Sequence, residues 1–360
     1  MERINFKKKF AEGREAAANS REFAVYQEVR DAVLAMLDYT MPDTAPSDYW
    51  KQELEGFIYM LDASPFIVEK LRHHTYHLTG LYEYFYRSHH NYAAESLRKK
   101  LEVLKNLDKS CLLVPEHPAF GGFGYRFEDV LYNLDTLKFY EFLIGLDRAG
   151  FIEKFKTGGK NVVLEIGSGW GGFAYQFKTL FPQSSYILVD FPQSFLFSAT
   201  YLQILFPNAR IYIGDGNLDS YRALEFTAYD FVFIPHYAWA SLRPQHVDLA
   251  INMASFQEMT DAQVRSYVHQ LAKWKTPYLY SLNRDISPNN REISGVTNII
   301  AERYIVAEQP VLAVPYHTLS LPEPSLKRDI KDIVKNIVGY TSKRMPREYR
   351  HVRALLSELD

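Results

Sequence analysis

The sequence lacks several features that define whole classes of protein. A single cysteine, Cys111, excludes an intramolecular disulfide framework and a CxxC metal clip. No run of about 18 apolar residues occurs, so no membrane-spanning helix is expected. Neither sign of charge dominates, since the chain has 41 basic and 43 acidic side chains, whereas phosphate backbones are bound by basic surfaces. We therefore expect neither a membrane nor a nucleic acid among the partners.

The beginning of the chain and its aromatic content narrow the class further. The first nine residues are charged and lead into no apolar segment, so a secretory signal is not expected and the protein is predicted to be cytoplasmic. Aromatic residues are plentiful, with 26 Tyr and 24 Phe. Core packing is the simpler explanation; the alternative is a ligand cavity, because a tyrosine ring packs while its hydroxyl finds a partner.

Three stretches of the chain differ in their hydrophobic pattern. Residues 1–150 have mainly helical spacing, with helices expected over 23–37 and 128–148. Residues 151–325 alternate short β-branched runs with helical ones, and 326–360 form a charged tail that we predict to be helical. Alternating strands and helices imply right-handed crossovers and a mostly parallel sheet. The predicted fold is α/β, with a Rossmann-like sheet, helices on both of its faces and a mainly helical accessory region before it.

The elements of the middle stretch follow from its periodicity. Strands are expected over 161–166, 185–190, 210–213, 231–234, 249–252 and 278–282. Helices are expected over 172–181, 192–206 and 261–274.

A glycine-rich turn joins the first of these strands to the first helix. Residues 165–172 read Glu-Ile-Gly-Ser-Gly-Trp-Gly-Gly, and Asp190 ends the next strand. Glycines let the backbone turn tightly and approach a ligand without a Cβ in the way. The glycine spacing alone is compatible with a nicotinamide-dependent oxidoreductase.

The charge of Glu165 favours a different cofactor. This residue lies two positions before the first glycine, at the carboxyl end of the strand, where ligands bind in such sheets. A carboxylate repels a pyrophosphate in a poorly solvated cleft. It suits S-adenosylmethionine, which has no phosphate but carries a sulfonium and an ammonium group. The turn, with Asp190 downstream, therefore resembles motif I of the class I methyltransferases.

The other expected cofactor contacts follow the same strands. Asp190 is predicted to accept hydrogen bonds from the ribose hydroxyls. Asp215, within a Gly-Asp-Gly segment, is predicted to bind the adenine amine, with a simple Asx or glycine turn as the alternative. The predicted set is Glu165, Gly167, Ser168, Gly169, Gly171, Asp190, Asp215, Gly216 and Asn252.

Two residues compete for the role of general base. His236 follows the strand at 231–234 and has a suitable ordinary pKa. Glu258 follows the strand at 249–252 and could act as a base in a dry pocket, or could orient a histidine. The alternatives are a packed loop histidine and a carboxylate at a helix N-terminus. Expected substrate contacts are Tyr125, Ser255 and Arg284.

Other histidines give no metal site in this interpretation. His73, His74 and His77 include an i, i+4 pair, but no glutamate stands between its members in the HExxH arrangement. We interpret the three as a solvated helix face and predict transfer without a metal.

Two segments together resemble a known family. The motif at 165–172 and the Ser-Phe-Gln-Glu-Met segment at 255–259 are similar to those of a sugar O-methyltransferase family, over about residues 47–321. The resemblance implies methylation of a sugar hydroxyl on a polysaccharide or a glycosylated metabolite. The alternatives are an NAD(P)-dependent oxidoreductase acting on a sugar nucleotide, and a non-catalytic binding protein. The accessory region is either a lid and acceptor wall or a surface for homodimer formation.

Overall fold

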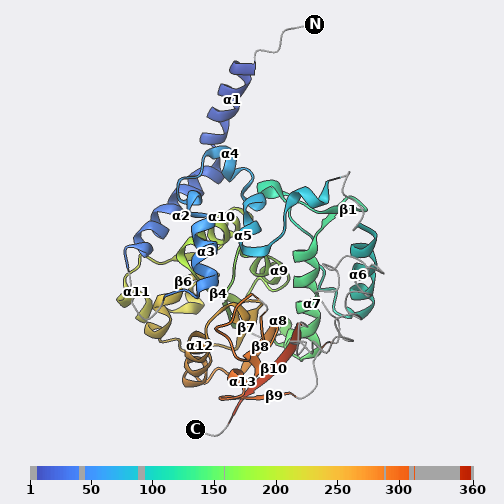
Figure 1. Ribbon diagram of the computed structural model, residues 1–360, viewed down its shortest axis with the longest axis vertical. Coiled ribbons are helices and arrows are strands. Elements are labelled where there is room, and N and C mark those ends of the chain that lie inside the picture. The colour runs from blue at the N-terminus through green and yellow to red at the C-terminus, as the bar shows by residue number, and fades with distance from the viewer. Residues whose placement is uncertain are drawn as a thin grey trace, which may run out of the picture.

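The computed structural model describes residues 6–39, 45–87, 94–157, 159–287, 289–307, 312 and 349–357. Within these ranges no helix is both long and apolar enough to cross a membrane. Figure 1 shows a sheet in the body of the molecule, with the N-terminal helices above it and α1 (Phe6–Ala18) projecting away from the rest.

The described α-helices alternate with strands from residue 150 onward. After α1 the helices are α2 (Arg21–Leu37), α3 (Asp48–Gly56), α4 (Pro65–Val68), α5 (Tyr76–Thr79), α6 (Ala94–Leu107), α7 (Leu134–Arg148), α8 (Ile152–Thr157), α9 (Gly172–Leu180), α10 (Phe195–Leu205), α11 (Leu218–Arg222), α12 (Asp261–Lys273) and α13 (Val296–Ile300). The strands are β1 (Tyr125–Phe127), β2 (Val130–Tyr132), β3 (Val162–Ile166), β4 (Ser185–Asp190), β5 (Ile211–Ile213), β6 (Phe231–Pro235), β7 (Leu249–Met253), β8 (Tyr278–Asn283), β9 (Tyr304–Val306) and β10 (Arg350–Leu356).

The main sheet has eight strands in the order β5-β6-β4-β3-β7-β8-β10-β9. The six strands β5, β6, β4, β3, β7 and β8 pair with one another in parallel, whereas β10 runs antiparallel to both β8 and β9. From β3 the chain proceeds to β4 on one side, and β7 then lies on the other side of β3. The carboxyl ends of β3 and β7 therefore form the topological switch point, where ligands bind in open α/β sheets. The predicted Rossmann-like α/β fold is confirmed.

Helices cover both faces of this sheet. Helices α7, α9 and α10 pack together, with Phe142 of α7 against Phe173 of α9 at 4.9 Å between ring centroids. Because β3 to β4 and β7 to β8 advance in opposite directions, right-handed crossovers place α9 and α12 on opposite faces. The six predicted strands of the middle stretch are confirmed to within one residue at either end, because each is a short apolar run whose side chains are mostly buried, or half-buried in the edge strand β5.

A buried ionic network connects the accessory helices to the glycine-rich turn. Arg72 is fully buried and pairs with Glu116 at 2.8 Å and with Asp135 of α7 at 3.0 Å. The same Asp135 accepts a hydrogen bond from the indole N–H of Trp170, and the Arg72 guanidinium lies 3.8 Å from that ring's centroid. A buried charge is tolerated when it is paired and hydrogen-bonded. The accessory region and the sheet are therefore joined by specific polar contacts as well as by a shared core.

Two predictions of secondary structure are wrong. The helix expected over 128–148 begins at Leu134, with Asn133 as its N-cap. Glu128 and Asp129 both have positive φ and form the two-residue turn of the β1–β2 hairpin, a conformation that asparagine, aspartate and glycine normally occupy. The tail expected to be helical contains strand β10, which closes the sheet between β8 and β9. The rest of the tail prediction lies outside the described residues.

Candidate functional site

A cavity of about 410 Å³ lies at the switch point. The turn after β3, the end of β4 and the turn after β7 form its floor, and α3, α5 and α7 contribute the opposite wall. Of the residues predicted from the sequence, those that line it are Glu165, Gly167, Ser168, Gly169, Asp190, Ser255 and Glu258. The cavity thus combines the expected cofactor turn with one of the two expected bases.

The backbone conformation explains why this turn is rich in glycine. Gly167, Gly169 and Gly171 have φ values of 73°, 54° and 80°, a region that residues with a Cβ rarely occupy. A Cβ at Gly167 would collide with the Ser255 side chain, whereas a Cβ at Gly169 would meet nothing within 4 Å. Gly169 therefore faces open space in the cavity, and Gly167 is packed beneath it.

Asp190 is hydrogen-bonded to the turn opposite it. Its carboxylate accepts the backbone N–H of Gly169 at 2.6 Å and that of Phe191 at 2.7 Å. Burial raises the pKa of Asp190 to about 6, and these two hydrogen bonds oppose that rise. The carboxylate is thus held at the end of β4, where it lines the cavity.

Glu165 is a buried carboxyl group, only 2% exposed. Its Oε2 accepts a 2.8 Å hydrogen bond from the Tyr186 hydroxyl. Burial raises the pKa of Glu165 to about 8, and the neighbouring Asp190 adds to this rise. The site therefore favours the protonated form until a cation is bound beside it.

Asn252 and Ser255 connect the turn after β7 to the end of β3. Asn252 Nδ2 donates to the Ile166 carbonyl at 2.8 Å and to Ser255 Oγ at 2.5 Å. Its Oδ1 accepts hydrogen bonds from the Phe256 backbone and from Asn283 Nδ2. Asn252 is fully buried beneath the cavity, so its contacts are with the chain and its role is to join the turns after β3 and β7. Between them, Ala254 has a φ of 60°, a strained conformation of the kind found at binding sites.

Glu258 lies across the cavity from the cofactor turn, at the end of the short helix Phe256–Glu258. Burial raises its pKa to about 8; Lys138 lowers it and Glu53 raises it. A carboxyl group with a pKa near the working pH can take a proton from a hydroxyl group. Glu258 is half-buried, and this burial raises its pKa in the direction that the sequence argument required of a base.

His236 is not brought into the cavity. It begins the short helix His236–Ser241 after β6, and its ring lies 4.6 Å from that of Phe191. Phe191 is the residue that faces the cavity, together with Trp50, whose ring lies 5.6 Å away. His236 therefore packs against a residue of the cavity wall and does not itself line the cavity.

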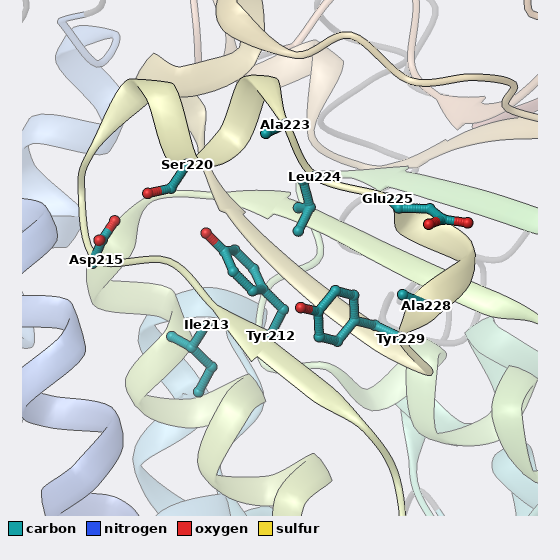
Figure 2. A pocket seen from close by; sticks show the side chains of 9 residues that line it. All are labelled: Tyr212, Ile213, Asp215, Ser220, Ala223, Leu224, Glu225, Ala228 and Tyr229. Atoms are coloured by element: carbon teal, nitrogen blue, oxygen red, sulfur yellow. The ribbon is translucent and has the colours of Figure 1, made fainter.

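Asp215 lines a different hollow, at the edge of the sheet formed by β5 (Figure 2). It is exposed, and its Oδ1 accepts the backbone N–H of Asn217, which is an Asx turn before α11. Gly216 packs against the Ala35 carbonyl and the Tyr39 ring, and Gly171 packs against Ser198 of α10. None of these three residues lines the cavity at the switch point.

The two remaining substrate candidates also lie outside the lining. Tyr125 donates its hydroxyl to the Phe85 carbonyl at 3.0 Å, within the accessory region. The Arg284 guanidinium lies 4.6 Å from the ring centroid of Tyr349, which does line the cavity. Arg284 also lowers the pKa of Glu258, so it acts on the site through charge.

Sequence reasoning missed several residues of the opposite wall. His77 is only 15% exposed and lines the cavity, so interpreting it as part of a solvated helix face was wrong. Its Nδ1 lies 3.7 Å from Oε2 of Glu53, which lines the cavity from α3. Tyr49 and Glu53 are four residues apart and share one face of α3, but no pattern in the sequence shows that this face meets the sheet.

No protein-family model matches the chain, and no curated protein matches it. Similar solved structures include WbdD, with 13% identity over 62% of this chain and 39% of WbdD, at a TM-score of 0.37. A second is phosphoethanolamine N-methyltransferase 2 of Haemonchus contortus, in complex with phosphomonomethylethanolamine and S-adenosylhomocysteine, with 10% identity over 63% of this chain and 58% of that one, at a TM-score of 0.36. A third is precorrin-6y C5,15-methyltransferase of Geobacter metallireducens, with 12% identity over 58% of this chain and 87% of that one, at a TM-score of 0.32.

The chain therefore covers less than two thirds of the length of WbdD and of the nematode enzyme. TM-scores of this size are too low to carry an inference about function, which depends on the chemistry of the cavity.

Proposed function

We propose that the protein is an S-adenosylmethionine-dependent methyltransferase that methylates a sugar hydroxyl. The observation that carries the proposal is the buried Glu165 at the switch point, beside a glycine turn whose Gly169 faces open space. An ammonium group placed there would pair with the Glu165 carboxylate in a poorly solvated site, where such a pair is strong. Asp190 has the position and charge to bind the ribose hydroxyls.

The same geometry disfavours a pyrophosphate-bearing cofactor. Dinucleotide sites present free backbone N–H groups of the glycine turn to the phosphates. Here the Gly169 N–H is already donated to the Asp190 carboxylate at 2.6 Å. A pyrophosphate would have to break that bond and lie between two carboxyl groups. This supports S-adenosylmethionine over NAD(P).

The acceptor would occupy the part of the cavity between Glu258 and the accessory helices. S-adenosylmethionine supplies an electrophilic methyl group on its sulfonium. The lining contributes aromatic surface from Tyr49, Trp50, Tyr76, Tyr82 and Tyr349, on which a sugar ring can pack. That the acceptor is a sugar is inferred from the resemblance of the segments at 165–172 and 255–259 to those of the sugar O-methyltransferase family.

Glu258 is the proposed general base. The acceptor oxygen approaches the methyl in line with the departing sulfur, the O–H proton passes to the Glu258 carboxylate, and the carbon–sulfur electron pair leaves with the neutral thioether. No cluster of three or more potential metal ligands occurs among the described residues. Transfer without a metal stays a prediction, and loss of activity on chelation that magnesium restores would contradict it.

Isothermal titration with S-adenosylmethionine, S-adenosylhomocysteine and NAD tests the proposal. We expect both sulfur ligands to bind and NAD not to bind. Failure of both sulfur ligands would overturn the proposal, and binding of NAD alone would favour the oxidoreductase. A protein that binds both sulfur ligands and transfers no methyl group to any glycan or glycosylated metabolite would favour the non-catalytic alternative.

A further inference from the structure

The cavity carries more acidic groups than the cofactor requires. Four carboxyl groups line it, those of Glu53, Glu165, Asp190 and Glu258. S-adenosylmethionine, as proposed above, would use Glu165 and Asp190. Glu53 and Glu258 remain, and both lie on the side where the acceptor would bind.

Three basic groups lie near the remaining pair, and Lys138 has the largest charge effect on Glu258, whose pKa it lowers. Lys138 lines the cavity, but its Nζ lies 3.1 Å from Oδ1 of Asp135, with which it forms an ion pair. His77 approaches Glu53 no closer than 3.7 Å. Arg284 affects Glu258 from outside the lining, over the ring of Tyr349. The acceptor side of the cavity therefore keeps an excess of negative groups.

Glu53 and Glu258 are close enough to affect one another. The Glu53 carboxylate raises the pKa of Glu258. Both also raise the pKa of Tyr49, to which burial makes the largest contribution. A neutral ligand that displaced water from this space would desolvate both carboxyl groups without adding a positive charge to offset that cost.

Aromatic rings enclose the same space. The rings of Tyr76 and Tyr82 are stacked with their centroids 4.9 Å apart, and those of Tyr49 and Trp50 meet edge to face at 5.6 Å. All four residues line the cavity. Aromatic faces attract cations, and the combination of such faces with carboxylates is typical of sites that bind an amine.

We propose that the acceptor carries a protonated amine, which pairs with Glu53 beside Glu258 among these aromatic rings, so that the substrate is an amino sugar. The proposal rests on the methyltransferase function above and names its substrate class. The amine keeps its proton and serves in recognition, while a hydroxyl group receives the methyl and gives its proton to Glu258. The positive charge also favours the ionised form of Glu258, which is the form that a base needs.

Three matched probes test the substrate class: methyl glucosaminide, its N-acetyl derivative and methyl glucoside. Each is titrated into the full chain saturated with S-adenosylhomocysteine, and binding is followed by ligand-observed nuclear magnetic resonance. We expect the glucosaminide to bind about tenfold more tightly than either neutral probe, which corresponds to roughly 1.4 kcal/mol. Equal or undetectable binding of the three probes would overturn the proposal.

Two matched variants test whether Glu53 causes the preference for the amine. Glu53→Gln is expected to abolish the preference for the amine, because the amide keeps the size of the side chain but loses its charge. Glu55→Gln lies on the same helix but is exposed and outside the cavity lining, so the preference should persist. A preference that survives Glu53→Gln would contradict the proposed ion pair.

Failure of the amino-sugar inference can be distinguished from failure of the proposed methyltransferase function. If S-adenosylhomocysteine does not bind, the methyltransferase proposal fails. If it binds and the amine gives no advantage, only the amino-sugar inference fails. In a turnover assay, the position of the new methyl group gives a further readout: a methyl on nitrogen would contradict the recognition role of the amine.

Discussion

The Tyr186 hydroxyl donates a 2.8 Å hydrogen bond to Oε2 of Glu165, and both side chains are buried. The pair connects β4 with the end of β3 at the floor of the cavity. A tyrosine hydroxyl is a neutral donor, so it supports the carboxyl group without neutralising its charge. Glu165 is therefore held in position at the floor of the cavity, where the charge of Lys138 lowers its pKa and the charge of Asp190 raises it.

Replacement of Glu165 by glutamine should weaken cofactor binding and stabilise the ligand-free protein. The amide can still accept the Tyr186 hydrogen bond, but it cannot pair with an ammonium group. We expect affinity for S-adenosylmethionine to fall at least tenfold, since a hydrogen bond to a charged group contributes about 1.5 to 3 kcal/mol. Calorimetric titration measures this loss, and Glu153→Gln, an exposed change on α8, is the matched control.

The stability change follows from the sign of the pKa shift. The folded-state pKa of Glu165, about 8, lies above the ordinary glutamate value. The folded protein therefore binds more protons than the unfolded chain between about pH 4 and 8, and its free energy of unfolding falls as the pH rises through that window. At pH 7 the glutamine variant should be more stable by on the order of 3 kcal/mol. Denaturant unfolding at pH 5 and pH 7 would contradict this if both proteins responded to pH alike.

Cofactor binding should release a proton at pH 7. Glu165 is mainly protonated in the ligand-free protein, because its pKa is about 8. A bound ammonium group lowers that pKa, so the carboxyl group ionises on binding. Titrations in buffers of different ionisation enthalpy should report about one proton released, and fewer above pH 8. The glutamine variant should lose this contribution, and a heat of binding that does not depend on the buffer would contradict the prediction.

Glu258 and His236 should differ sharply in their effect on turnover. Glu258→Gln removes the proposed base and should lower kcat by about 10² to 10⁴. His236→Gln changes a residue behind Phe191 and should leave kcat within about threefold of the wild-type value. An equal loss in both variants would contradict the assignment.

The pH profile gives an independent test of the same base. Glu258 must be ionised to accept a proton, and burial raises its pKa to about 8. The kcat/KM of the wild-type protein, which reports the pKa values of the free enzyme, should rise with pH up to about 8 and then level off. A profile that is flat from pH 6 to pH 9 would exclude Glu258 as the base.

Gly167→Ala should both destabilise the protein and abolish cofactor binding. The residue has a φ of 73°, and an added Cβ would collide with Ser255. Strain of this kind costs about 1 to 3 kcal/mol before the collision is counted. Gly159→Ala is the control, since a Cβ there meets nothing within 4 Å. Denaturant unfolding and titration with S-adenosylhomocysteine should separate the two variants clearly.

Local patterns were sufficient to predict the central part of the fold. The strands from 162 to 283 are short runs of apolar residues, so the local sequence of each is enough to predict an extended conformation. The hairpin at 125–132 and strand β10 were missed, because their strand conformation depends on partners. The β10 residues reach the sheet only through pairing with β8 and β9, far away in the sequence.

The candidate site likewise has one part that the sequence predicted and another that only the tertiary structure placed. Glu165, the glycines and Asp190 were recognisable because one turn and one strand end place them together, and the charge of Glu165 indicated the cofactor. The choice between His236 and Glu258 could not be made from the sequence, because both follow strands of the same sheet. Only the packing of Phe191 against His236, and of α3 and α5 over Glu258, decides which of them faces the cavity. Short-range periodicity carries no information about such contacts, which arise when segments distant in the sequence close over the sheet.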